Sequence, residues 1–174
     1  MRKKLTVLST LLFISGRILS QDLPKESAYL QDSNLDKFVG TWEYNSKLDS
    51  TLIIIELHRV KLLMSDAGFY YDTIIGVHTY IKRGVTMETS APFNSTNNYN
   101  AATIMAIDKP FGTNQLKIKT SLKDITKKKR IVAYLEIQPD NPNALLLSFQ
   151  DVDGIRINQE KGFTMPTNIL LTKR

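Results

Sequence analysis

The sequence predicts an all-β domain, either an antiparallel sandwich or a barrel, built from many short strands. Around Trp42 the residues alternate with a period of two, which places successive side chains on opposite faces of a strand. No segment after Phe38 has a convincing helical period. Turn-forming clusters recur at intervals of about 8–12 residues, a spacing that is typical of sandwiches and barrels.

The expected elements begin with a helical turn at 35–38, because the favoured N-cap residues Asp32–Asn34 precede it. Leu52 to Ile55 is apolar on both faces, so part of its strand is expected to be covered on both sides. Gly76 lies in mid-strand and predicts a bulge or a bend. Strands are expected over 38–44, 51–64, 69–82, 102–107, 115–120, 130–137, 144–150, 155–158 and 163–172.

The two longest strands are joined by the turn cluster Ser65–Gly68, which predicts a hairpin. In that hairpin His58 faces Ile75, and His78 faces Ile55. These two residues are the only histidines of the chain, and they are not paired with each other. A catalytic zinc ion needs three protein ligands, so we expect no metal site.

No motif for catalysis stands out in the sequence. The chain has no Cys, no Gly-x-Ser-x-Gly elbow and no Gly-rich phosphate loop. We therefore expect no catalytic residues, no cofactor and no enzymatic activity, although a triad assembled in space leaves no sequence motif.

Residues 1–20 have the three-part layout of a signal peptide. Arg2 to Lys4 is positive, and Leu5 to Ser15 is apolar but shorter than the roughly 20 residues that span a bilayer. We expect cleavage after Ser20 and export to the periplasm, the outer surface or the medium. No Cys lies near the site, so a lipid anchor is not expected. The alternative, a buried N-terminal element, lacks a partner nearby in the sequence.

Export would change the charge of the protein. The whole chain carries a net charge of +6, and four of these charges lie in residues 1–20, which leaves +2. The basic composition is therefore weak evidence for an anionic partner such as nucleic acid. Residues 21–34 are polar and read as an N-terminal arm, and 35–174 is expected to be one domain that needs no disulfides.

The segment Phe38-Val39-Gly40-Thr41-Trp42 follows the expected helical turn. It resembles the first-strand Gly-x-Trp signature of lipocalins and related calycin barrels. The resemblance implies an up-and-down antiparallel barrel of about 8–10 strands. It also implies structural roles for Gly40 and Trp42, since the Trp closes one end of the barrel and the Gly lets the chain pack closely. A basic residue near the end, here Lys173 or Arg174, would cover the Trp.

A wider resemblance covers nearly the whole chain after residue 20. Phe38 to Tyr44, Tyr70 to Asp72 and the ending Phe163 to Lys173 are similar to an uncharacterised family of secreted Bacteroidota proteins, which carries a domain-of-unknown-function label. That family implies no activity and no ligand-binding residues. It supports a small lipocalin-like barrel.

Two kinds of surface motif are present. Lys127-Lys128-Lys129-Arg130 is a basic run that would suit anionic polysaccharide or lipid, but a solvated hairpin tip is the favoured interpretation. Asp49-Ser50-Thr51 and Asp72-Thr73-Ile74 resemble the O-glycosylation sites of Bacteroidota, the first in an exposed turn and the second in a strand. Asn94-Ser95-Thr96 matches an N-glycosylation triplet.

We expect a non-enzymatic extracytoplasmic protein that binds a small apolar molecule inside a barrel. The alternative is a surface interaction or structural module with a filled barrel, which would bind an envelope component. Its working surface would be the strip of Tyr70, His78 and Tyr80, or the basic run at 127–130. Neither hypothesis involves nucleic acid or a transmembrane segment.

The signal-peptide interpretation predicts the first residue of the processed chain. N-terminal sequencing of the protein from its native host should begin at Gln21. An intact N-terminus at Met1 would contradict the interpretation.

Overall fold

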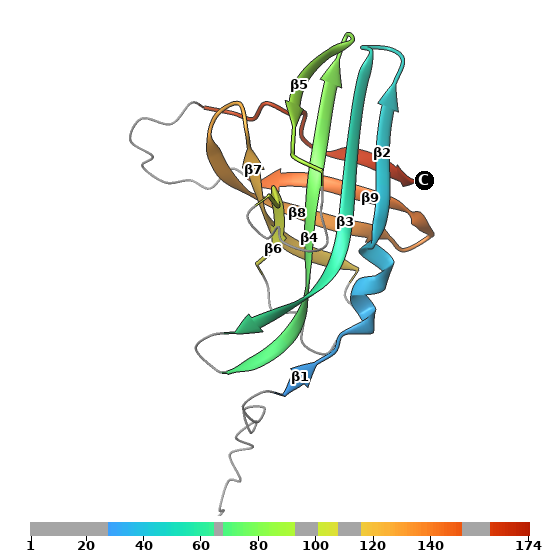
Figure 1. Ribbon diagram of the computed structural model, residues 1–174. Coiled ribbons are helices and arrows are strands. Elements are labelled where there is room, and N and C mark those ends of the chain that lie inside the picture. Colours follow the sequence, from blue (N-terminus) through green and yellow to red (C-terminus); the bar gives the residue numbers. More distant parts are fainter. Residues whose placement is uncertain (1–27, 65–67, 93–100, 108–115, 151–160) are drawn as a thin grey trace, which may run out of the picture.

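A computed structural model of the chain describes residues 28–64, 68–92, 101–107, 116–150 and 161–174 (Figure 1). Within them a closed antiparallel barrel forms from eight strands, and the predicted all-β barrel is confirmed. The strands are β2 (Gly40–Ser46), β3 (Thr51–Met64), β4 (Phe69–Lys82), β6 (Ile104–Ala106), β7 (Lys117–Asp124), β8 (Lys129–Gln138), β9 (Asn141–Gln150) and β10 (Ile169–Lys173). The predicted signal peptide lies outside the described residues.

The barrel has an up-and-down order and closes at two places that join distant parts of the sequence. β10 pairs with β2, where Lys173 is opposite Trp42. β4 pairs with β6, where Gly76 is opposite Ile104. Every other neighbouring pair in the wall follows the chain order.

Two further strands, β1 (Tyr29–Leu30) and β5 (Val85–Thr89), lie beside β4. β5 forms an antiparallel hairpin with the end of β4, and β1 pairs with β4 in parallel. Neither was predicted, because β1 is very short and β5 is mostly polar. They bring the described total to ten strands, within the expected range of about 8–10.

The predicted helical turn is a 3-10 helix, η1 (Ser33–Phe38). The Asp32 side chain caps it by accepting from the backbone N–H of Asn34 at 2.9 Å. Leu35 and Phe38 are buried, and η1 lies against β3 and β4 at one end of the barrel (Figure 1). No helix among the described residues has the length and apolar character needed to cross a membrane.

The hairpin of β3 and β4 has the predicted register. His58 is opposite Ile75 and His78 is opposite Ile55, as expected. Alternation puts Ile55 on the inner face, where it is 0% exposed. Leu52 to Ile55 was expected to be covered on both faces, but Leu52 and Ile54 are only half-buried.

Two predictions about the strands need correction. The segment predicted as a strand at 163–172 becomes a strand only at Ile169. Thr164 is hydrogen-bonded to the Asp124 side chain instead of joining a ladder, and Asn168 has a φ of +58°, outside the strand region. Gly76 causes no bulge, since the β3–β4 register is continuous across it. The strand predicted at 155–158 lies outside the described residues.

Gly76 is required by a close approach between β4 and β3. A Cβ at this position would lie 2.6 Å from the Glu56 carbonyl oxygen and 2.7 Å from Cδ2 of Leu57. The carbonyl belongs to the backbone of the neighbouring strand, so it has little freedom to move away. Glycine therefore lets the two longest strands pack at this point in the wall.

The close approach predicts the effect of enlarging Gly76. Gly76→Ala should lower the free energy of unfolding by about 1–3 kcal/mol, measured by urea denaturation, because it overpacks the wall. Gly76→Val should cost more, although valine has the higher strand propensity. A Val variant more stable than the Ala variant would show that propensity, and not crowding, decides this position.

Candidate functional site

Trp42 is packed inside the barrel and makes specific contacts at the η1 end. Its side chain is 0% exposed, and its indole Nε1–H donates to the Phe38 carbonyl oxygen at 2.8 Å. Lys173 Nζ lies 5.2 Å from the centre of the indole ring. Of the two basic residues considered, Lys173 therefore covers the Trp, while Arg174 pairs with Glu43.

Gly40 makes room for this lysine. Its φ is +130°, and a Cβ at this position would lie 3.0 Å from Lys173 Cε. A side chain at Gly40 would therefore be strained and would press on the aliphatic part of Lys173. Gly40, Trp42 and Lys173 form one packed unit with no surface left for a ligand on the indole.

The two histidines lie on opposite faces of the barrel wall. His58 is on the outer face, half-buried, with Nε2 2.8 Å from Glu56 Oε1. His78 is on the inner face and buried. The proposed outer strip of Tyr70, His78 and Tyr80 is wrong, because His78 and Tyr80 are 2% and 3% exposed and face Ile55 and Ile53 inside the barrel.

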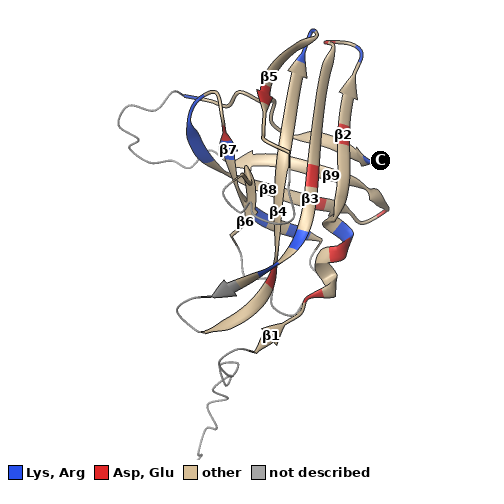
Figure 2. Ribbon diagram, viewed as in Figure 1, with Lys and Arg blue, Asp and Glu red and all other residues tan. Residues whose placement is uncertain are grey.

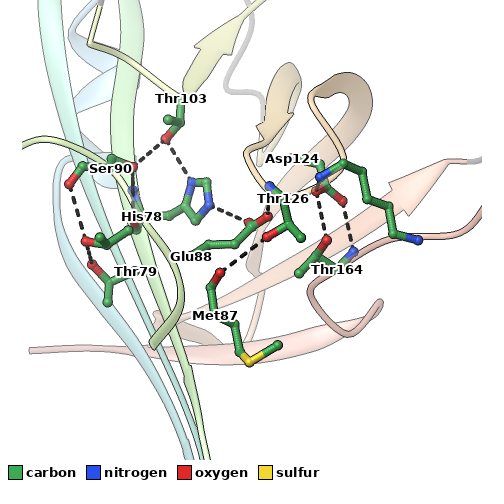
Figure 3. Close-up of polar contacts among 11 residues, drawn as sticks. His78, Thr79, Met87, Glu88, Ser90, Thr103, Asp124, Thr126 and Thr164 are labelled. Carbon is green, nitrogen blue, oxygen red and sulfur yellow. Dashed lines mark hydrogen bonds and ion pairs between the residues drawn. The ribbon is translucent and has the colours of Figure 1, made fainter. Parts of the chain in front are cut away.

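His78 belongs to a buried polar cluster that sequence reasoning missed (Figure 3). We define the His78 cluster as His78, Glu88, Ser90 and Thr103. The side chains of His78 and Glu88 have no exposed surface, and His78 Nε2 lies 3.0 Å from Glu88 Oε2. On the other side of the ring, Nδ1 lies 2.8 Å from Thr103 Oγ1. The cluster joins β4 and β5 to the residues beside β6.

The hydroxyl contacts determine which ring nitrogen of His78 carries a proton. Thr103 Oγ1 lies 3.0 Å from Ser90 Oγ, and Ser90 Oγ donates to the His78 carbonyl oxygen at 2.8 Å. Each hydroxyl has one proton, and the carbonyl can only accept. All the contacts are hydrogen bonds only if Nδ1–H donates to Thr103 and Thr103 donates to Ser90. Nε2 then faces Glu88 Oε2 at 3.0 Å.

Glu88 also closes a part of the wall that lacks backbone pairing. Among the described residues β5 pairs only with β4, so no ladder joins it to the turn after β7. Glu88 Oε1 accepts from the backbone N–H of Thr126 at 2.8 Å. The Thr126 hydroxyl donates to the Met87 carbonyl oxygen at 3.2 Å. These contacts hold β5 against the β7–β8 turn.

Asp124 secures the other side of the same turn. It accepts from the backbone N–H of Lys127 at 2.8 Å, the backbone N–H of Thr164 at 2.9 Å and the Thr164 hydroxyl at 2.8 Å. Burial alone would raise the pKa of Asp124. The hydrogen bonds from these donors and from the Glu88 carboxyl lower it by more than burial raises it, so the pKa lies below its ordinary value of 3.8. The carboxylate thus ties the segment before β10 to the β7–β8 turn.

The His78 cluster contains groups that general acid–base catalysis uses, but its geometry favours a structural role. A catalytic group must come within hydrogen-bonding reach of a substrate atom. His78 and Glu88 are sealed, and their hydrogen-bonding atoms are directed at each other or at neighbouring strands. In the described part of the chain, no three His, Cys, Asp or Glu side chains are grouped to hold a metal ion.

A third buried carboxylate, Asp72, fastens the N-terminal arm to β4. It accepts from the Tyr29 hydroxyl at 2.6 Å and from the Asp32 backbone N–H at 2.9 Å. Arg59 Nε lies 3.9 Å from the same carboxylate. The hydrogen bond to Asp72 and burial raise the pKa of Tyr29. This contact explains the short parallel strand β1.

The two motifs that resemble O-glycosylation sites differ in their accessibility to solvent. Ser50 is exposed in the turn between β2 and β3, as expected. Thr73 is 1% exposed in β4, so its hydroxyl is inaccessible in the folded protein, again as expected. The triplet at Asn94 lies outside the described residues.

The basic run at 127–130 spans the end of the β7–β8 turn and the start of β8. Two of its side chains contact the segment at 161–162 of the same chain. Lys127 Nζ donates to the Lys161 carbonyl oxygen, and Lys129 Nζ donates to that of Gly162. Lys129 is buried, with Nζ 5.5 Å from the centre of the Phe163 ring. The predicted solvated tip is therefore correct for Lys128 and Arg130, which are exposed, and wrong for Lys129.

Comparison with known protein families identifies the family to which this chain belongs. The profile of DUF6705, a family of unknown function, matches residues 1–174. The chain belongs to DUF6705. No curated protein and no solved structure matches it. Membership of DUF6705 confirms the expected domain-of-unknown-function label, whereas the Bacteroidota origin and the lipocalin likeness stay predictions.

Asp124→Asn should destabilise the protein, because an amide group cannot accept at both former oxygens and turns a donor toward a backbone N–H. We expect a loss of about 1–3 kcal/mol at neutral pH by urea denaturation. The control Asp140→Asn, at an exposed residue of the β8–β9 turn, should change little.

The loss also has a predicted pH dependence. The folded-state pKa of Asp124 is depressed, so its stabilisation is complete above the unfolded pKa of about 3.9. It disappears as the pH falls through the folded-state pKa. The difference between wild type and Asp124→Asn should therefore shrink in acid, and a difference that grows in acid would contradict this role.

Proposed function

We propose that this protein is a non-enzymatic, exported β-barrel that acts through its outer surface. The supporting observation is the burial of the side chains that point into the barrel. The large inward side chains on five of its strands are 0% exposed: Trp42, Ile53, Ile55, Ile74, Leu135, Leu145 and Leu147. A side chain without accessible surface borders no void the size of a water molecule, so this part of the interior is occupied by the protein itself.

A small apolar ligand inside the barrel is the competing proposal. Barrels of about eight strands either fill with side chains or hold one small ligand. An apolar ligand in the described interior would have to displace residues such as Leu135 or Leu145 from full burial. The packing therefore favours the filled barrel, in which binding takes place on the outside.

The non-enzymatic part of the proposal rests on the polar groups. The buried acids and the imidazole are used in joining β5, the β7–β8 turn and the segment before β10. The exported part rests on the three-part layout of residues 1–20. Neither feature names a partner.

The filled interior predicts a large difference between two adjacent leucines in β9. Leu145 points inward and is 0% exposed, whereas Leu146 is on the outer face and half-buried. Leu145→Ala should lower the free energy of unfolding by about 2–5 kcal/mol, because the truncation leaves a cavity. Leu146→Ala is the matched control and should cost much less.

Two results would favour the interior-ligand proposal. One is a Leu145→Ala variant that is no less stable than Leu146→Ala, as expected for a side chain that borders an open cavity. The other is native mass spectrometry of the protein from its host that shows a bound apolar molecule at a stoichiometric level. The filled barrel predicts the mass of the polypeptide alone.

A further inference from the structure

Two hairpin turns form one exposed surface at the end of the barrel opposite η1 (Figure 1). Residues 47–50 connect β2 to β3, and Arg83 with Gly84 connects β4 to β5. The backbone N–H of Arg83 donates to the Ser50 carbonyl oxygen at 2.8 Å. This hydrogen bond holds the two turns side by side, so their side chains act as one surface.

This surface combines apolar and basic side chains. Leu48 is 99% exposed, Val85 is 60% exposed and Met87 is 43% exposed. Leu48 lies in the first turn, and Val85 and Met87 lie in the part of β5 that follows the second turn. A single exposed apolar residue is ordinary, but three near two adjoining turns point to an interaction surface. We define the tip face as Lys47, Leu48, Lys82, Arg83, Val85 and Met87.

The charges of the tip face are mostly positive. Figure 2 shows Lys and Arg at the ends of both hairpins, and Lys47, Lys82 and Arg83 are all exposed. The acid in these turns, Asp49, accepts a hydrogen bond from the Thr51 hydroxyl at 2.9 Å. Three cations and one acid give the turns a net charge of +2, equal to the charge of the whole chain after residue 20.

Arg83 occupies a backbone conformation that disfavours it. Its φ is +52° and that of Gly84 is +75°, so both residues of the two-residue loop are left-handed. Gly, Asn and Asp are the residues that suit the first position of such a loop. Arginine at a position that favours Gly, Asn or Asp is a reason to ask what its side chain does.

We propose that the tip face docks on an anionic lipid surface. Leu48 and Val85 enter the headgroup region, and Lys47, Lys82 and Arg83 pair with lipid phosphates. This deepens the proposed function, since it rests on binding through the outer surface. A lipid surface fits better than an anionic polysaccharide, because a hydrated polymer offers exposed leucine and valine side chains no apolar environment.

Co-sedimentation with vesicles tests the proposal. The protein, purified in the form in which the cell leaves it, is mixed with vesicles of equal parts phosphatidylglycerol and phosphatidylcholine, or of phosphatidylcholine alone. We expect binding to the anionic vesicles that weakens with salt, and much weaker binding to the zwitterionic ones. Equal binding to both, or binding to neither, overturns the proposal.

Two variants separate the apolar from the basic contribution. Leu48→Ser should weaken binding to anionic vesicles about tenfold, because it removes an inserted apolar side chain. The matched control is Leu170→Ser, at a leucine that is 52% exposed on β10. If both serine variants bind like the wild type, or both lose binding equally, insertion of Leu48 is excluded.

Arg83→Gly separates binding from folding. Glycine relieves the left-handed conformation, so the thermal midpoint should stay or rise, while vesicle affinity falls about fivefold through loss of one cation. A variant that loses both stability and binding would show that Arg83 has a structural role only.

A soluble polyanion distinguishes the two anionic partners. Binding to alginate that is insensitive to Leu48→Ser, without binding to vesicles, would replace the lipid by a polysaccharide. That outcome would overturn the lipid proposal and leave the filled, outward-acting barrel intact. Failure of the Leu145 comparison in β9 would instead remove the filled barrel and leave vesicle binding unaffected.

Discussion

One side of β4 pairs with β3 along its whole length, and the structure depends on how the other side changes its partner strand at His78. Before His78 in the chain, β4 pairs with β6 as far as Gly76. After His78, β4 pairs with β5 from Thr79 onward. The backbone of His78 therefore falls between two partners. Ser90 satisfies it, because its Oγ accepts from the His78 N–H at 2.8 Å and its backbone N–H donates to the His78 carbonyl oxygen at 2.9 Å. A buried backbone group left unpaired here would be costly, so a hydroxyl residue completes the wall.

The same interruption explains why Glu88 and Asp124 are buried beside the β7–β8 turn. In the described part of the chain no backbone ladder joins β5 to the β7–β8 turn, and the Glu88 side chain makes this connection. A charge-bearing group is tolerated in the interior when its hydrogen bonds are satisfied. Glu88 and Asp124 meet this condition, which makes them substitutes for missing strand pairing.

Short sequence patterns predicted the structural features that depend on residues close together in the chain. The register of β3 and β4 followed from one turn, and a structural role for Trp42 was implied by the resemblance of its segment to the lipocalin Gly-x-Trp signature. The His78 cluster was missed because it depends on two pairings that the sequence did not predict. The β4–β5 hairpin brings Glu88 to His78, and the closure of β4 on β6 brings Thr103. β5 was missed because four of its five residues are exposed and its one buried residue is a glutamate. The tip face likewise requires knowledge that two turns are adjacent.

The pairing of β2 with β10 has a consequence for the order of folding. Trp42 and Lys173 are opposite each other in the closed wall but 131 positions apart in the chain. Contacts between such distant residues form slowly, because a long loop must close first. The stacking of Lys173 on the indole is therefore expected among the last steps of folding. Since Trp42 is the single tryptophan, its intrinsic fluorescence offers a built-in reporter of the moment at which the barrel closes.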